Sequence, residues 1–443
     1  MLLEFKMENY KSFRDECVFS MKVAPKQKGL DYSILTEMVG NKEYKGVCSA
    51  VIYGPNASGK TNIIGAMDTF KQIVLRGNIQ NVVQKDSPNV AASSLELIPN
   101  NKLETAKPVK FSIAFIESGM LIEYAISLDL GLFLERDYQR KILEESLNVN
   151  NSIIFSRGLN LEIGDLKVID KFMLSAYMKN EKGAYSLAKS SLQEDDLFLT
   201  NGFKTMFSAK LVSLITRWLD KNFLVIYKFD SMQLVPKFPE QKKGLVHISK
   251  SLNEAATLFG VDSNELGYIV DGKSGEGKLC SVFSDNSKQT AIPVEQFESY
   301  GTIRFIHMFL LIVDILKSGG TLVVDELDAS IHPMVLMNII TLFHNDELNT
   351  KNSQLIFNTH NPIFLNSNLF RRDEIKFIDR GYENDESVHY SLSDFGTSGS
   401  KGVRKNEDYM KNYFVDRYGA IRVIDLQPLL RRIITEDHED NSK

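Results

Sequence analysis

The chain contains few cysteines and no long apolar run. Its three cysteines, Cys17, Cys48 and Cys280, lie far apart among 443 residues and form no CxxC pair. This spacing fits a reducing compartment and predicts neither a disulfide framework nor a zinc site. The longest apolar run, Phe305–Leu316, contains a histidine and an aspartate and is too short to cross a bilayer. The N-terminal residues lack the apolar core of a signal peptide, so we expect a cytoplasmic protein with no membrane partner.

An excess of positive charge is also absent. The formal net charge is −5 at pH 7, so composition supplies no global argument for nucleic-acid binding. Sustained a/d heptads are missing, which argues against a long coiled-coil arm. Apolar residues make up 43% of the chain and charged residues 25%, which is typical of a globular protein with a full core. The length allows two or three domains, or one large α/β domain with an insertion.

One stretch has the strongest functional pattern in the chain. The apolar run Val51–Tyr53 has the composition of a strand, and Asn62–Leu75 carries apolar residues at helical spacing. Between them, Gly54–Thr61 matches G-x-x-x-x-G-K-[ST] at every fixed position. Strand, glycine loop and helix in this order are the context that a phosphate-binding loop requires. We therefore predict a nucleotide site here.

Each part of this predicted phosphate-binding loop has a physical role. Gly54 and Gly59 let successive backbone N–H groups face phosphate oxygens, and the dipole of the following helix adds positive potential. Lys60 would neutralise the β- and γ-phosphates, and the hydroxyl of Thr61 would bind Mg²⁺. The predicted nucleotide contacts are Gly54, Pro55, Asn56, Ala57, Ser58, Gly59, Lys60 and Thr61.

A pair of carboxylates follows a later apolar strand. Thr321–Val324 has the pattern of a strand buried on both faces, and Asp325 and Glu326 come directly after it. Asp325 would hold Mg²⁺ through water, and Glu326 would be the general base that orients the attacking water. The alternative is that these carboxylates only cap the helix that begins near Pro333. The phosphate-binding loop upstream favours the catalytic interpretation.

Two further landmarks fit the same site. Gln354–Thr359 is another buried-strand pattern, and it ends at His360 after room for one helix and one return strand. This topology would bring His360 beside the phosphates. Ser299 and Gly301 open the apolar helix Ile303–Leu316, where exposed N–H groups make a second anion site. Taken alone, Ser299 would be an ordinary N-cap.

The order of these motifs resembles the head of an ABC-type ATPase of the group that contains SMC, RecF and OLD proteins. The resemblance covers residues 1–70 and about 297–380, and it implies ATP and Mg²⁺ as cofactors. In that family the signature motif acts in trans. Ser299 and Gly301 of one head would therefore contact the γ-phosphate held by Lys60 of another. Tyr300 and Thr302 depart from the LSGGQ form of that motif.

The resemblance also assigns roles outside the main motifs. The opening residues are similar to the family's N-terminal strand and adenine-side loop, which would place Lys11 and Ser12 near the base and ribose. Asp328 falls in the D-loop, and His360 matches the switch histidine. Gln84 is the candidate Q-loop glutamine and metal contact, with Gln72 and Gln80 as alternatives.

The resemblance implies a fold and a division of the chain. We expect an α/β P-loop NTPase fold of the ABC-ATPase head type, with a mixed sheet, an antiparallel N-terminal lobe and a helical insertion. The expected segments are lobe I at 1–160, a helical insertion at 161–222, lobe II with the signature, Walker B and switch histidine at 223–395, and a C-terminal extension at 396–443.

The resemblance implies an ATPase with slow turnover that dimerises head to head on ATP. The chain is most similar to the short stand-alone ATP-binding proteins of bacterial phage-defence operons, where a separate effector carries the toxic chemistry. We therefore expect a sensor or scaffold that controls an effector protein encoded nearby. The alternative is a DNA-binding ATPase of the RecF or SMC kind in repair or recombination.

Overall fold

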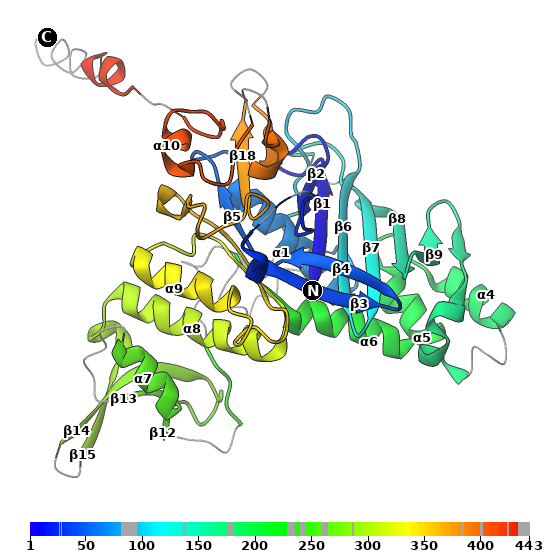
Figure 1. Cartoon of the computed structure of the whole chain (residues 1–443). Coiled ribbons are helices and arrows are strands. Elements are labelled where there is room, and N and C mark those ends of the chain that lie inside the picture. Colours follow the sequence, from blue (N-terminus) through cyan, green and yellow to red (C-terminus); the bar gives the residue numbers. More distant parts are fainter. Residues whose placement is uncertain are drawn as a thin grey trace, which may run out of the picture.

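A six-stranded sheet lies at the centre of the computed structural model (Figure 1). We call it the central sheet. The structure describes residues 1–25, 27, 29–80, 95–135, 138–175, 181–227, 235–239, 244–258, 265–285, 288–381, 385–398, 402–422 and 425–432. In spatial order the central strands are β11 (Phe223–Ile226), β16 (Thr321–Val324), β17 (Gln354–Asn358), β5 (Ser49–Tyr53), β18 (Ile375–Arg380) and β19 (Ser387–Ser391). All neighbours are parallel except β18 and β19.

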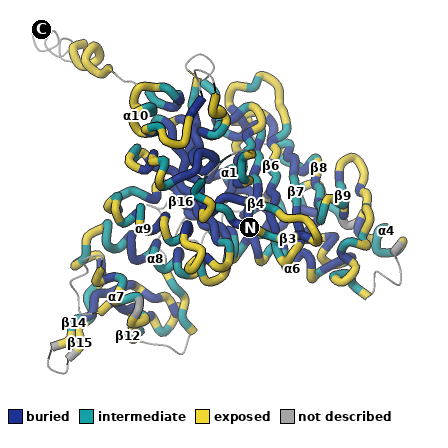
Figure 2. Tube along the Cα trace, in the orientation of Figure 1, coloured by how far each residue is buried: buried dark blue, intermediate teal, exposed yellow. Residues whose placement is uncertain are grey.

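Both faces of the central sheet are covered. Ala50 and Ile52 of β5 pack into the same core as α1 (Lys60–Arg76), whereas Val51 and Tyr53 pack into the core that contains α8 (Tyr300–Ser318) and α9 (Pro333–Phe343). Alternate residues of a strand point to opposite faces, so a continuous apolar run is what a doubly covered strand needs. Figure 2 shows the buried segments concentrated around β16, α1 and β6.

A second, antiparallel sheet covers the other side of α1, and we call it the N-terminal sheet. Phe5 of β1 and Phe111 of β6 both contact Phe70 of α1, so the helix lies between the two sheets. Its seven strands, in spatial order, are β10 (Leu161–Ile163), β9 (Ser152–Arg157), β8 (Lys141–Val149), β7 (Met120–Asp129), β6 (Val109–Glu117), β1 (Leu2–Glu8) and β2 (Cys17–Ser20).

The alternation of apolar and polar residues in Leu2–Met7 and Glu16–Met21 predicts a hairpin that feeds the sheet holding Val51–Tyr53. The hairpin is confirmed, but this placement is wrong. β1 and β2 pair antiparallel as the alternation of apolar and polar residues indicates. They do not extend the sheet that holds β5; they form one edge of the N-terminal sheet through β6. The pairing partner of an edge strand depends on long-range contacts, which local alternation does not encode.

The segment predicted as a helical insertion is largely helical. It packs against the N-terminal sheet, where the ring of Trp218 stacks on Phe115 with centroids 3.8 Å apart. Its elements are a 3-10 helix (Leu166–Phe172), α4 (Glu181–Ser191), a π-helix (Leu199–Phe203), α5 (Lys204–Met206), α6 (Ala209–Arg217) and a second π-helix (Trp218–Asn222).

A small four-stranded sheet adjoins α8 at the lower left of Figure 1. Its strands are β12 (Gly244–His247), β13 (Glu265–Val270), β14 (Gly277–Asp285) and β15 (Lys288–Pro293), with α7 (Lys250–Leu258) beside them. The glycine-rich stretch 272–278 connects β13 to β14, which confirms a hairpin turn and excludes a second phosphate loop.

The remaining elements are short, and none of the helices in the described ranges is long and apolar enough to cross a membrane. They are the hairpin β3 (Ile34–Val39) and β4 (Lys42–Val47), α10 (Tyr409–Phe414), and 3-10 helices at Asp31–Ser33, Val294–Gln296, Pro362–Phe364 and Leu392–Phe395. Together the elements form an α/β fold with a mixed central sheet and an antiparallel N-terminal lobe, as expected for a P-loop NTPase.

Candidate nucleotide-binding site

The predicted phosphate-binding loop connects β5 to α1. Neighbouring atoms leave no room for a side chain at either of its two glycines. A Cβ on Gly54 would lie 2.2 Å from the carbonyl oxygen of Ile378. Gly59 has φ +111, and a Cβ there would lie 2.6 Å from the Ser387 hydroxyl. A side chain at Gly54 would therefore displace the backbone of Ile378, and one at Gly59 would displace the Ser387 side chain and require a strained backbone. Without side chains at these positions, the backbone N–H groups of the loop can face phosphate oxygens.

Lys60 is buried within this loop. Its Nζ donates hydrogen bonds to the carbonyl oxygens of Gly54 at 2.7 Å and Pro55 at 3.0 Å. Burial lowers the pKa of Lys60 to about 8, although the carboxylates of Glu326, Asp325 and Asp328 act in the opposite direction. Phosphate oxygens would satisfy this ammonium group better than two backbone carbonyls do, because charge-assisted hydrogen bonds are the stronger kind.

A chain of hydrogen bonds joins the loop to the end of β16. The Thr61 hydroxyl donates to Oδ1 of Asp325 at 3.1 Å, and the side-chain amide of Asn358 donates to the same oxygen at 2.6 Å. Asp325 is only 6% exposed. A hydroxyl and a carboxylate at this distance, beside a phosphate-binding loop, are the oxygen donors that Mg²⁺ takes in such sites. The residues present therefore fit Mg²⁺.

Glu326 has an unusual backbone and an exposed side chain. Its φ of +52 is in the left-handed region, which is rare for a residue with a Cβ. Its N–H donates to Oδ1 of Asn358, and its carbonyl accepts from the guanidinium of Arg304. These two contacts hold the strained backbone, and strain of this kind gathers at functional sites. The carboxylate is left exposed beside the loop, where a general base must stand.

His360 and Asp328 lie near the charged groups of the site, among them Lys60. The Thr359 hydroxyl donates to Oδ2 of Asp328 at 2.6 Å, which ties the end of β17 to the loop after β16. Desolvation and then the charge of Lys60 lower the pKa of His360, while Asp328, Glu326 and Asp325 oppose this. The imidazole is therefore neutral at pH 7 and can accept or donate a hydrogen bond.

Ser299 and Gly301 lie at the exposed start of α8. The Ser299 hydroxyl caps this helix by accepting from the Thr302 N–H at 3.1 Å. A Cβ on Gly301 would lie 2.3 Å from the carbonyl oxygen of Ser330, so the helix start packs closely on the loop that contains Asp328. Among the described residues of one copy, no hydrogen bond or ion pair joins Ser299 or Gly301 to the phosphate-binding loop.

The two residues predicted on the adenine side differ in position. Ser12 lies against the loop: its Oγ accepts from the Asn62 amide at 2.8 Å and from the Ser387 hydroxyl at 2.7 Å. Lys11 is engaged elsewhere: its Nζ pairs with Glu96 and donates to the Tyr227 hydroxyl. The structure thus brings Ser12 to the phosphate-binding loop and engages Lys11 with an acidic partner.

The predicted Q-loop residue, Gln84, lies outside the described residues. Of its alternatives, Gln72 donates to Asp68 one turn earlier on α1, and Gln80 donates to Asp195. Both of these partners lie away from Thr61 and Asp325.

Several residues near the loop were missed by sequence reasoning. Asn358 and Arg304 have only a weak signal, since each lies in a largely apolar strand or helix that holds other polar residues as well. Ser387 and Arg380 have none. They reach the loop from β19 and β18 and bond to the carbonyl oxygens of Ser58 and Ala57, contacts that only the sheet order creates.

Comparisons with known proteins found a matching family and similar solved structures. The model of the family described as "AAA domain, putative AbiEii toxin, Type IV TA system" matches residues 49–366. The comparison with curated proteins found no match. Among solved structures, the SmcHead bound to the C-winged helix domain of ScpA is 15% identical, with a TM-score of 0.40 and coverage of 89% of this chain and 99% of that chain.

A second solved structure, the SMC head domain from Thermotoga maritima, is 14% identical, with a TM-score of 0.33 and coverage of 88% of this chain and 98% of that chain. The family match runs from the first residue of β5 to beyond His360 and spans well over half of the chain. The chain therefore belongs to this family of AAA domains.

Proposed function

We propose that this protein binds and hydrolyses ATP with Mg²⁺. The observation that carries the proposal is the hydrogen-bonded series from Thr61 through Asp325 to Asn358, which lies directly beside the buried ammonium group of Lys60. Lys60 would neutralise the terminal phosphates. Bound Mg²⁺ would supply further neutralisation of the phosphate oxygens, held by Thr61 and Asp325.

The other residues act on the attacking water and the terminal phosphate. Glu326 accepts a proton from the water, since its carboxylate is exposed while its backbone is held by Asn358 and Arg304. His360, neutral at pH 7, contacts the terminal phosphate as a hydrogen-bonding group. Asp328 accepts a hydrogen bond from the Thr359 hydroxyl and so holds the end of β17 to the loop after β16.

The second part of the proposal is that ATP joins two copies head to head. Ser299 is exposed at the start of α8, with Gly301 two residues further on, so these signature residues would serve the site of a second copy. Phe297 and Tyr300 beside them are 47% and 55% exposed, and exposed aromatic side chains are enriched at protein interfaces. The N–H groups at the start of α8 could then reach the phosphates bound by a partner. ATP would shift the population toward the dimer, because it binds that state better.

Glu326→Gln tests both parts. Removal of the general base should slow hydrolysis by roughly a hundredfold to ten-thousandfold, while ATP binding is kept. The ATP-bound protein should then persist as a dimer in light scattering. A monomer at saturating ATP and Mg²⁺, with binding intact, would exclude the head-to-head arrangement but leave the ATP site standing.

Ser299→Arg tests the signature assignment. The larger, charged side chain should block closure and hydrolysis without weakening the binding of ATP to the monomer. An exposed Ser190→Arg substitution on α4 serves as the matched control and should leave both unchanged. If Ser299→Arg hydrolyses ATP at the normal rate, the motif is assigned wrongly.

For the biological role, we propose an ATP-driven sensor or scaffold that controls a separate effector in bacterial phage defence. The family description, which names a toxin and a toxin–antitoxin system, supports a role of this kind. Coexpression with the product of the neighbouring gene should yield a complex that ATP stabilises or releases. ATP-dependent, salt-sensitive binding to duplex DNA with stimulated hydrolysis would instead indicate a DNA-repair ATPase.

A further inference from the structure

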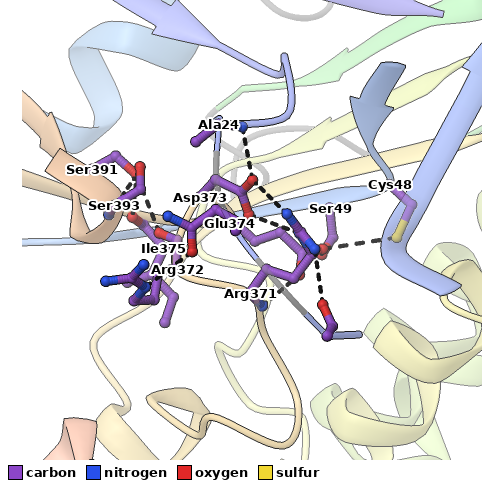
Figure 3. Close-up of polar contacts among 12 residues, drawn as sticks. Ala24, Cys48, Ser49, Arg371, Arg372, Asp373, Glu374, Ile375, Ser391 and Ser393 are labelled. Atoms are coloured by element: carbon purple, nitrogen blue, oxygen red, sulfur yellow. Dashed lines mark hydrogen bonds and ion pairs between the residues drawn. The ribbon is translucent and has the colours of Figure 1, made fainter. Parts of the chain in front are cut away.

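A second group of polar side chains lies at the opposite end of the central sheet from the phosphate-binding loop. Cys48 and Ser49 stand at the start of β5, and Glu374 directly precedes β18. His344 comes directly after the last residue of α9. Figure 3 shows Cys48, Ser49 and Glu374 turned toward one another from neighbouring strands. The residues are remote in sequence, and the sheet order brings them together.

The potential ligand atoms of this group are close together. The Oε1 atom of Glu374 lies 3.1 Å from Nε2 of His344 and 3.8 Å from Sγ of Cys48. The three ligand atoms all lie within 4.8 Å of one another. The Ser49 hydroxyl lies 2.6 Å from the same carboxylate oxygen and 3.0 Å from Nε2 of His344.

The group is closed to solvent. Cys48 and Glu374 are 0% exposed, and His344 is 6% exposed. The ring of Tyr32 covers His344, with centroids 5.6 Å apart. A buried carboxylate costs free energy unless it is paired with opposite charge and hydrogen-bonded.

The guanidinium next to Glu374 is already engaged. Arg371 forms a two-pronged pair with Asp373, from Nε and Nη2 at 3.0 Å each, as Figure 3 shows. Only the backbone N–H of Arg371 reaches Glu374, at 2.7 Å to Oε2. Oε1 of Glu374 therefore faces the thiol, the hydroxyl and the imidazole.

We propose that Cys48, His344 and Glu374 bind a Zn²⁺ ion. Sulfur, imidazole nitrogen and carboxylate oxygen are the ligand set that zinc takes, with bonds of about 2.0–2.3 Å. A tetrahedral ion with such bonds places its ligand atoms roughly 3.3–3.6 Å apart. The separations from Oε1 of Glu374 to Nε2 of His344 and to Sγ of Cys48, 3.1 and 3.8 Å, lie within a few tenths of an ångström of this range, and the third pair lies within 4.8 Å.

The remaining ligand position and the burial indicate the kind of site. The Ser49 hydroxyl, which is near both Glu374 and His344, is the candidate fourth ligand. A thiolate and a carboxylate together neutralise Zn²⁺, which makes the buried group neutral overall. Sites closed on all sides are structural rather than catalytic. The ion would fasten the end of α9 to β5 and β18, independently of nucleotide binding at the other end of the sheet.

Metal content and cobalt spectroscopy test the proposal. The full-length protein, purified after expression with added zinc and extensive dialysis, should carry about one zinc ion per chain by mass spectrometry. Replacement by Co²⁺ should produce a thiolate-to-cobalt charge-transfer band. Removal of zinc by a chelator should lower the melting temperature, and added Zn²⁺ should restore it.

Cysteine variants locate the ion. Cys48→Ser should lose the cobalt band and most of the zinc. The double variant Cys17→Ser/Cys280→Ser is the matched control, because both residues are buried free cysteines outside the group. It should keep the zinc and the band, which assigns them to Cys48 even if Cys48→Ser does not fold. Wild-type protein without zinc and without the band would show a hydrogen-bonded cluster only, and zinc retained in Cys48→Ser would place the ion elsewhere; either result overturns the proposal.

Discussion

The two ends of the central sheet use polar residues in opposite ways. At the carboxyl end, Glu326 and His360 are exposed, and Glu326 has a left-handed backbone. At the amino end, Glu374 and Cys48 are fully buried, and the Cys48 thiol donates a hydrogen bond to the Glu374 carboxylate. Glu326 and His360, which would act on the ligand, are accessible, whereas Lys60 and Asp325 beside them are buried. Side chains that hold strands together can be satisfied within the fold. The comparison predicts that changes at the first end alter binding more than stability, and that changes at the second end do the reverse.

Lys60→Ala is expected to have the largest effect. Loss of charge-assisted contacts to the phosphates should weaken ATP binding by about 3 kcal/mol or more, roughly a hundredfold. Stability should hardly fall, because the buried ammonium group is removed at the same time. Titration calorimetry with ATP and Mg²⁺ measures the affinity. Lys45→Ala, at an exposed ion pair with Glu43, is the control and should bind normally. Normal ATP affinity in Lys60→Ala would show that the carboxyl end of the central sheet does not bind the phosphates through Lys60.

Ser49→Ala should show the opposite pattern at the amino end. The Ser49 hydroxyl lies 2.6 Å from Oε1 of Glu374 and is the candidate fourth zinc ligand, so its loss leaves the buried group with one partner fewer. We expect the free energy of unfolding to fall by about 2 kcal/mol, with ATP affinity unchanged. Chemical denaturation measures the first quantity and calorimetry the second. Ser118→Ala, in an exposed hairpin turn, should change neither. A weaker affinity for ATP would mean that the two ends are coupled.

The pH dependence of ATP binding sharpens the contrast further. Burial lowers the pKa of Lys60 to about 8, from an ordinary value of 10.5. Phosphates favour the protonated form, so binding above pH 8 must take up a proton. Affinity should fall by about tenfold per pH unit there, a cost of about 1.4 kcal/mol.

Stability should respond to pH with the opposite sign. Between pH 8 and 10.5 the folded chain binds fewer protons at Lys60 than the unfolded chain does. The penalty for burying the charge is fully present below pH 8 and disappears as pH rises through this window. ATP affinity that is flat from pH 7 to 9.5 would show that the lysine keeps its ordinary pKa.

Glu326→Gly should raise stability by a small amount. Glycine adopts a positive φ without strain, so the free protein should become more stable by about 1 kcal/mol. Hydrolysis should be lost, since the carboxylate is removed. Denaturation without nucleotide, compared with Glu326→Gln, separates backbone strain from the side chain. A stability equal to that of Glu326→Gln would mean that the backbone at this position is not strained.

The sequence was sufficient for the elements with strong local patterns. The phosphate-binding loop, α1, the hairpins β1–β2 and β6–β7, and the strands that end at Asp325 and near His360 are found where periodicity and turn residues predicted them. The placement of β1 and β2 was wrong because strand pairing depends on contacts over long distances in the chain. Asn358 was passed over because an asparagine in a strand has no meaning until its neighbour is known.

The sequence by itself determined the nucleotide loop, since glycine spacing, lysine and threonine act within one continuous turn. It also predicted no zinc site, because the three cysteines form no CxxC pair. Tertiary structure decided the rest. Parallel strand order brings Asp325 and Asn358 to Thr61 at one end of the central sheet, and Cys48, His344 and Glu374 together at the other. The physical reason is that strands a few ångströms apart join residues separated by hundreds of positions, which spacing along the chain does not reveal.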